Sequence, residues 1–184
     1  KNSLLENILM KILISADMEG IAGVRGKGFL NESSQDHLKA CNLLTSEINI
    51  VVKACFDSGA TKIIVTDGHG SGNNIVSEKL DQRVKCFLGK KGDFSMIEGI
   101  SEVDYLIFLG YHGKANVSSS YCSHTNSTKT ISKVIINGIE CGEAQINALV
   151  AKYLGVKVIL LMGTDFAVSE IKKEMPEITT ITTK

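Results

Sequence analysis

The chain has 184 residues, which is enough for one domain with a substantial core and too few for two ordinary domains. Hydrophobic residues make up 43% of the sequence and charged residues 22%, as in ordinary globular proteins. Basic and acidic residues balance to a formal net charge of zero, so the composition favours neither nucleic acid nor an anionic membrane as a partner.

Strands and helices are predicted to alternate along the chain. Residues 11–16 form a short apolar strand, followed by a polar, Gly-rich loop that extends to about Ser34. Residues 35–57 carry apolar side chains at helical spacing and end before Gly59. The remaining predicted elements are strands at 61–66, 84–88 and 105–109, a hairpin near 131–141 around Asn137-Gly138, a helix at 143–154, a strand at 156–162 and a helix at 165–174.

This alternation predicts an α/β fold. Near-continuous apolar strands indicate a mostly parallel sheet with helices on both faces, a Rossmann-like three-layer arrangement, with a hairpin near residues 131–141. Residues 10–184 are expected to form one domain. Residues 1–9 precede Met10 and are expected to be an upstream remnant outside the domain.

The cysteines bear on the cellular compartment. The five cysteines are scattered, odd in number and without a Cys-x-x-Cys pair, which indicates neither a disulfide framework nor a zinc ribbon. No apolar run approaches the ~20 residues of a membrane helix, and no secretory signal is recognisable. These patterns predict a cytoplasmic protein with no membrane partner.

Acidic and histidine side chains follow several of the predicted strands. Asp17 and Glu19 come after the first strand, His69 after the second and His112 after the fourth, while Glu143 opens a helix. In open α/β sheets, ligands bind beyond the carboxyl ends of the strands. These side chains are therefore expected to gather at one edge of the sheet.

Each signal has an ordinary structural alternative. The acids could belong to a solvated loop, and His69 could be a turn histidine bonded to backbone. An acid in the first helical turn is favoured by the helix dipole, and Glu140 competes with Glu143 for a site role. The Gly-rich loop at 68–72 could instead cradle a phosphate, although it matches neither a Walker loop nor G-x-G-x-x-G.

Taken together, these residues predict a metal site. Histidine and carboxylate ligands without cysteine suit zinc or a similar divalent ion. A tetrahedral site needs four ligands, and the sequence offers five: Asp17, Glu19, His69, His112 and Glu143. Five ligands are better matched to two ions that share one bridging carboxylate. The corresponding chemistry is metal-assisted hydrolysis of an amide or a phosphoester.

The chain contains, in this order, the motifs SADMEGIAG, TDGHGSGNN, FSMIEG, FLGYHGKA, CSHT and NGIECGEAQINA. In these motifs it resembles the D-aminopeptidase family of zinc metallopeptidases, from about residue 11 to its end. The resemblance implies an enzyme that releases N-terminal D-amino acids from short peptides and assembles as a homo-oligomeric ring. The resemblance implies that residues 10–184 are a catalytic, metal-binding domain. Because members of this family continue beyond the point where this chain stops, this domain is expected to lack a smaller C-terminal region.

The resemblance also implies roles for individual residues. Asp17 would bridge two zinc ions, with Glu19 and His69 completing one site and with His112 and Glu143, rather than Glu140, completing the other. His124 in CSHT would be the catalytic nucleophile or proton-transfer group. Three alternatives remain at this point: a related amidase or phosphoesterase, a small-ligand or nucleotide-binding module that uses residues 68–72, and an assembly subunit that binds metal without turnover.

Overall fold

A computed structural model describes residues 9–89 and 92–184 of the chain. Within these residues, six strands form one sheet in which every neighbouring pair is parallel. The order across the sheet is β3 (Lys85–Phe87), β2 (Ala60–Asp67), β1 (Met10–Ala16), β4 (Tyr105–Tyr111), β7 (Lys157–Gly163) and β8 (Thr179–Thr182). Of the expected remnant at 1–9, all but Leu9 lies outside the described residues.

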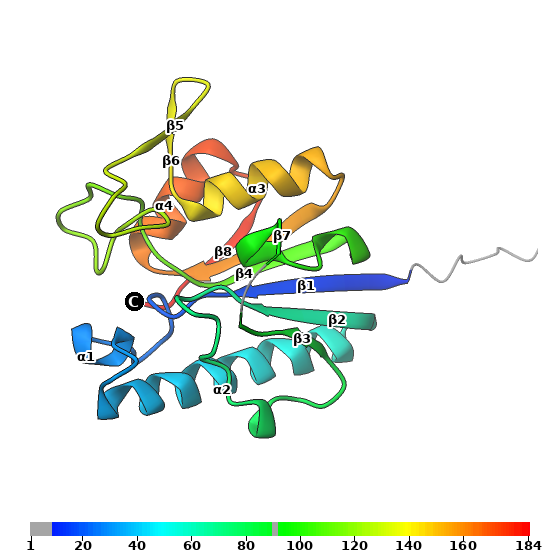
Figure 1. Ribbon diagram of the computed structural model, residues 1–184. Helices are drawn as coiled ribbons and strands as arrows, with labels where there is room; N and C mark the ends of the chain where they lie inside the picture. Colours follow the sequence, from blue (N-terminus) through cyan, green and yellow to red (C-terminus); the bar gives the residue numbers. More distant parts are fainter. Residues whose placement is uncertain (1–8, 90–91) are drawn as a thin grey trace, which may run out of the picture.

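Helices cover both faces of this sheet (Figure 1). Helix α2 (Gln35–Asp57) lies on one face, while α3 (Glu143–Tyr153) and α4 (Asp165–Glu174) lie on the other. The three-layer α/β arrangement that the sequence predicts is therefore confirmed. None of the helices in the described part of the chain combines the length and the apolar character needed to cross a membrane.

The limits of α2 follow from local chemistry. The Ser34 side chain caps its first turn by accepting a hydrogen bond from the Asp36 N–H at 3.2 Å. At the other end, Gly59 adopts a φ of 96°, a conformation that costs glycine little and ends the helix. The observed range equals the predicted one because a cap, an apolar stripe and a glycine all act locally.

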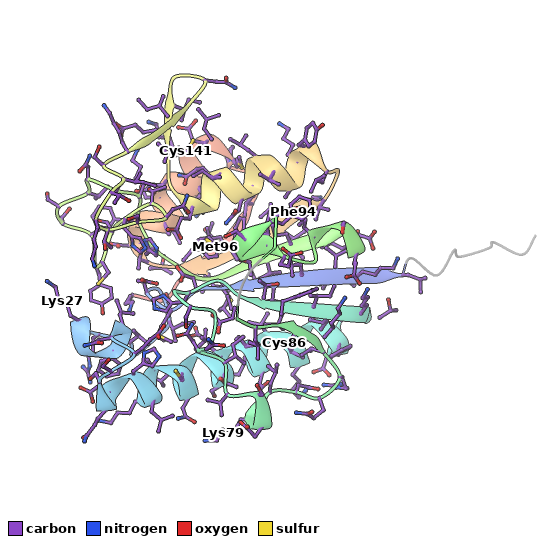
Figure 2. The ribbon with its side chains drawn as sticks, in the orientation of Figure 1. Lys27, Lys79, Cys86, Phe94, Met96 and Cys141 are labelled. Atoms are coloured by element: carbon purple, nitrogen blue, oxygen red, sulfur yellow. The ribbon has the colours of Figure 1, made fainter. Side chains whose placement is uncertain are left out.

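The core lies on both sides of the sheet, where side chains fill the space under the helices (Figure 2). Ile12 and Ile14 of β1 pack with Leu44 of α2, whereas Leu13 points to the other face and packs with Ala148 of α3. Alternate residues of a strand face opposite ways, so a central strand covered on both faces must be apolar throughout.

The segment after β1 differs from the predicted polar loop. It contains a short helix, α1 (Lys27–Leu30), and the side chains of Met18, Ile21 and Val24 are completely buried. These apolar residues pack into the core under α2, which pulls the loop onto the domain. The predicted Gly-rich loop to Ser34 is present apart from the four residues of α1, and the feature that was not predicted is the burial of three apolar side chains.

The structure adds short elements that the sequence did not indicate. The 3-10 turns η1 (Ser77–Lys79), η2 (Ser95–Ile97) and η3 (Ile100–Glu102) are each three residues long. Such a turn has no room for a repeating apolar pattern, so periodicity cannot predict it. The η2 turn borders the candidate site.

The hairpin is confirmed. Strands β5 (Val134–Ile136) and β6 (Ile139–Cys141) pair antiparallel and extend away from the sheet (Figure 1). Asn137 and Gly138 both have positive φ, at 51° and 82°, as a tight two-residue hairpin turn requires.

The carboxyl ends of β1, β2 and β4 meet at one edge of the sheet. Ala16, the last residue of β1, pairs with Asp67 on one side and Leu109 on the other. Beyond Ala16 the chain passes so close to β4 that a Cβ on Gly110 would lie 2.0 Å from the Asp17 carbonyl oxygen. The Asp17 N–H also donates to the Leu109 carbonyl oxygen at 2.8 Å. These contacts hold Asp17 at the middle of this edge.

Candidate metal centre

Asp17 stands between two histidines at the carboxyl edge of the sheet. Its Oδ1 lies 3.4 Å from Nδ1 of His69, and its Oδ2 lies 3.4 Å from Nε2 of His112. The side chain is almost completely buried, which by itself raises the pKa of the carboxyl group. The hydrogen bond with His69 and the charge of His112 outweigh burial and hold the pKa well below its usual range. Asp17 therefore presents one anionic oxygen to each side.

On one side, Asp17, Glu19 and His69 form a group whose candidate ligand atoms lie within 4.8 Å of one another. Nδ1 of His69 is 3.0 Å from Oε2 of Glu19. Burial lowers the pKa of His69, but its hydrogen bonds with Asp17 and Glu19 raise it to about 11. Without a metal ion, the imidazolium form of His69 balances the two carboxylates.

Asp67 shapes the loop that carries His69. Its Oδ1 accepts hydrogen bonds from the His69 N–H at 3.2 Å and the Asn74 side-chain amide at 2.9 Å. Its Oδ2 accepts from the N–H groups of Asn74 and Ile75 at 2.6 and 3.1 Å. The Asn74 amide also donates to the His69 carbonyl oxygen at 2.8 Å. This role of Asp67 was not predicted from the sequence, although an Asp two residues before a loop N–H is a known turn signal.

The same contacts bear on the phosphate-binding alternative for residues 68–72. The Gly68 N–H donates to the Ala16 carbonyl oxygen at 2.6 Å, and the Gly72 N–H donates to the His69 carbonyl oxygen at 2.8 Å. With the His69 N–H bound to Asp67, these backbone donors are engaged inside the protein. A phosphate cradle needs such donors pointing at the ligand, so the geometry disfavours that function.

On the other side, Asp17, His112 and Glu143 form a second such group. Nε2 of His112 lies 3.5 Å from Oε2 of Glu143. Burial lowers the pKa of His112, but the nearby carboxylate of Glu143 and the charge of Asp17 raise it to about 10. The other ring nitrogen, Nδ1, lies 2.9 Å from the Gly113 carbonyl oxygen. That contact orients the ring so that Nε2 faces the carboxylates.

Glu143 is held in place by the loop that carries His124. Its Oε1 accepts a hydrogen bond from the Asn126 N–H at 2.8 Å. Glu140, the competing acid, is instead exposed and lies 3.4 Å from the ammonium group of Lys114. The structure thus brings Glu143, and not Glu140, to the other candidate residues.

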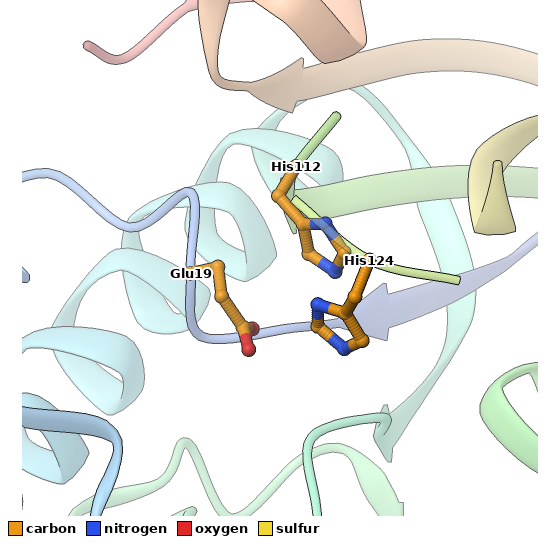
Figure 3. Close-up of side chains that lie close together, drawn as sticks. All are labelled: Glu19, His112 and His124. Atoms are coloured by element: carbon orange, nitrogen blue, oxygen red, sulfur yellow. The ribbon is translucent and has the colours of Figure 1, made fainter. Parts of the chain in front are cut away.

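His124 lies against His112. The two rings stack with centroids 4.2 Å apart and planes inclined by 11° (Figure 3). Nε2 of His124 is 3.6 Å from Oε1 of Glu143, and Glu19, His112 and His124 form a further group within ligand distance. His124 was predicted as a catalytic rather than a ligating residue, and this position allows it to reach a molecule held beside the carboxylates.

The donor set fits a divalent cation. Within the described residues, Asp17 Oδ2 and His112 Nε2 are buried atoms without a hydrogen-bond partner, and they face each other across 3.4 Å. Unpartnered buried polar atoms are costly, and a cation between them would satisfy both. Carboxylate and imidazole ligands without thiolates are typical of zinc.

Comparison with known proteins identifies the family of this chain. Residues 10–184 match the model of the peptidase M55 family, described as D-aminopeptidase. The chain belongs to this D-aminopeptidase family. It is 33% identical over 176 residues to a D-aminopeptidase from Bacillus subtilis (strain 168). The resemblance seen in the sequence motifs is therefore confirmed at the level of the family.

A solved structure of a D-aminopeptidase family member has the same fold. It is the Zn-dependent D-aminopeptidase DppA from Bacillus subtilis, described as a self-compartmentalizing protease, with a TM-score of 0.86 and 34% identity. The likeness covers 93% of this chain and 62% of that one. The present chain likewise spans 64% of the length of the curated relative it matches, covering 95% of its own length.

Proposed function

We propose that this protein is a zinc-dependent aminopeptidase that removes N-terminal, D-configured residues from short peptides. The observation that carries the proposal is the position of Asp17, with one oxygen facing His69 and the other facing His112. A carboxylate that faces two sets of ligands is what a bridged two-metal site requires. Membership of the D-aminopeptidase family supports the substrate class.

In this proposal, Asp17 would contribute to two zinc sites. Glu19 and His69 would hold one ion and His112 and Glu143 the other, in agreement with the two groups that share Asp17. Bound zinc supplies Lewis acidity for the scissile carbonyl and an activated water. The protein contributes a fixed, buried set of donors, so little reorganisation is needed when the reaction begins.

His124 transfers protons in the proposed reaction. Its Nδ1 lies 2.8 Å from the Cys122 carbonyl oxygen, and the hydrogen-bond network therefore assigns the ring proton to Nδ1. Nε2 is then a proton acceptor beside Glu143. It accepts the proton of the attacking water and returns it to the amine that leaves, which is general base and general acid catalysis by one group.

We also propose that copies of the chain assemble with one another. The support is the relative described as a self-compartmentalizing protease, whose fold this chain shares. Sedimentation of the purified protein at several concentrations tests this part: a species several times the mass of the 19.8 kDa chain is expected. The cytoplasmic location remains a prediction from the sequence.

The decisive experiment compares metal content and turnover in three proteins purified without chelator: wild type, Asp17→Ala and Glu140→Ala. Wild type and Glu140→Ala are expected to hold roughly two zinc ions per chain, as in a bridged two-metal site, and Asp17→Ala far less. Glu140 is the matched control because it is a nearby carboxylate outside the cluster. Hydrolysis of D-aminoacyl peptides in preference to L-aminoacyl peptides is expected.

Two outcomes would count against this function. Failure of the wild-type chain to take up zinc would remove the basis for a metallopeptidase. Zinc binding with hydrolysis of phosphoesters, and none of peptides, would favour the alternative enzyme class.

A further inference from the structure

The cleft beside the metal centre has an apolar side. Asp17, Glu19, His69, His124 and Glu143 line a cleft of about 1270 Å³. Helix α3 contributes Glu143 and, further along, Ile146, Asn147 and Val150 to the same lining. Residues three, four and seven positions after Glu143 lie on one helical face, so these side chains extend the wall that begins at the metal centre.

The segment at 93–97 forms the rest of this wall. Phe94 and Met96 line the cleft. Met96 belongs to the core cluster against which Phe94 and Val150 pack. Nδ2 of Asn147 lies 3.6 Å from Sδ of Met96 and donates to the Tyr111 hydroxyl at 3.0 Å. These contacts tie α3 and the segment to the end of β4, so the wall is a rigid surface.

The wall exposes both apolar and polar side chains, because Asp93 and Ser95 of the same segment are exposed and also line the cleft. Phe94, Ile146 and Val150 are each only partly buried although they are hydrophobic, and each borders the cleft. Lys27, Leu30 and Asn31 at α1 also line the cleft. A ligand that lies against α3 therefore meets the apolar side chains of Ile146 and Val150, with Phe94 beside them.

We propose that the apolar wall formed by Phe94, Ile146 and Val150 binds the side chain of the residue that is released, and that it selects uncharged aliphatic side chains. This inference rests on the proposed aminopeptidase function. The rise of ~1.5 Å per residue places Ile146 and Val150 about 5 and 10 Å along α3 from Glu143. When the scissile carbonyl of a substrate lies at the metal centre, the side chain on the adjacent Cα begins close to that carbonyl. It therefore lies within about 5–10 Å of the metal centre, the range in which Ile146 and Val150 are found.

The test uses amino-acid hydroxamates as probes, because they chelate zinc whether or not the chain turns over peptides. Binding of glycine, leucine and glutamate hydroxamates, in D and L forms where they exist, is measured by calorimetry on the zinc-loaded chain. Leucine hydroxamate of one configuration is expected to bind roughly tenfold or more tighter than glycine hydroxamate, as a buried aliphatic side chain contributes in a hydrophobic pocket. Glutamate hydroxamate is expected to bind no better than glycine hydroxamate, because its charged side chain would lose water.

Two variants of α3 test whether the wall is responsible for the tighter binding of leucine hydroxamate. Ile146→Asn is expected to remove most of the advantage of leucine over glycine while leaving glycine hydroxamate binding and zinc content unchanged. Leu149→Asn is the control, because Leu149 lines a different groove on the other side of α3. It is expected to change neither affinity.

The results distinguish failure of the apolar wall to bind the side chain from failure of the proposed aminopeptidase function. If glycine hydroxamate does not bind in a zinc-dependent way, the metal centre fails and both proposals fall. If glycine hydroxamate binds and leucine hydroxamate shows no advantage, or Ile146→Asn leaves the advantage intact, the wall does not bind the side chain and only the present inference is overturned.

Discussion

His112 and His124 share one backbone acceptor. Nδ1 of His112 lies 2.9 Å from the Gly113 carbonyl oxygen, and the backbone N–H of His124 donates to the same oxygen at 3.2 Å. The rings then stack at 4.2 Å. One carbonyl thus fixes a candidate ligand and a candidate catalytic group relative to each other, so that only one nitrogen of His112 faces the carboxylates.

From this relationship we expect His124→Gln to separate catalysis from metal binding. The variant should retain zinc, because His124 completes neither of the groups that share Asp17. Turnover of a D-aminoacyl peptide should fall roughly 10²–10⁴-fold, the usual effect of losing a general acid–base group. Zinc content and kcat measured on the same preparation check this. Loss of zinc in parallel with activity would instead make His124 a ligand.

Asp67→Asn is expected to weaken zinc binding without unfolding the protein. The asparagine side chain can place only one acceptor where Asp67 now uses both oxygens, so the loop holding His69 loses part of its support. Groups that orient a metal ligand are typically worth 10–100-fold in affinity, and a loss of about that size is expected. Competition with a chelating dye measures it.

Asp104→Asn is the control for that substitution. Asp104 precedes β4 at the opposite end of the sheet, where its carboxylate is 3.3 Å from the Lys11 N–H. Zinc affinity should be unchanged in this variant. An equal loss in both variants would indicate a general effect on stability rather than support of His69.

Zinc binding should release protons. In the metal-free protein the pKa values of His69 and His112 are raised to about 11 and about 10, so both rings are protonated at neutral pH. Because metal ligands must be deprotonated, binding is expected to release about two protons per chain. Calorimetric titration in buffers with different ionisation enthalpies measures the number. Zinc binding without proton release would exclude His69 and His112 as ligands.

The same shifts predict how the metal-free protein responds to alkaline pH. Both histidines have folded-state pKa values above the ordinary value of 6.5, so the folded state binds more protons than the unfolded state. Their contribution to the free energy of unfolding is fully present below about pH 6.5. It is lost as the pH rises through the folded-state pKa values of about 10 and about 11. Urea unfolding of the metal-free protein, prepared with a chelator, should show this decrease in the free energy of unfolding between neutral pH and about pH 11. His69→Gln should reduce it.

Removing the metal should lower thermal stability. A ligand present at about a hundred times its Kd stabilises the folded state by roughly 2.7 kcal/mol. For a domain of this size, that corresponds to a fall in Tm of roughly 5–10 °C on adding a chelator. Asp17→Ala should be nearly insensitive to the chelator, and an equal response in wild type and Asp17→Ala would argue against a site centred on Asp17.

Much of the fold was predictable because its signals are local. The cap at Ser34, the apolar stripe of α2 and the turn at Gly59 act within a few residues, and the predicted range of that helix was correct. Strands β1 and β4 were likewise recognisable as continuous apolar runs. The η2 turn was not predicted, because three residues carry no period, yet it borders the wall that we propose binds the substrate side chain.

Two features of the candidate site could not be read from residue types. Asp67 is the last residue of β2, and its hydrogen bonds to the following loop make it a support for His69. The burial of Met18, Ile21 and Val24 was also unforeseen. Whether a side chain is a ligand, a clamp or an anchor depends on neighbours that are distant in sequence.

The alternation of apolar strands and helices can be recognised in the amino-acid sequence, and it implies that Asp17, His69 and His112 follow strands of a parallel sheet. The position of Asp17 between the two histidines depends instead on how the strands are ordered in the folded protein. The order β2-β1-β4 places the first strand between its neighbours, and Ala16 pairs with Asp67 and Leu109 at the same level. Strand order follows from packing between distant segments, which no local pattern encodes.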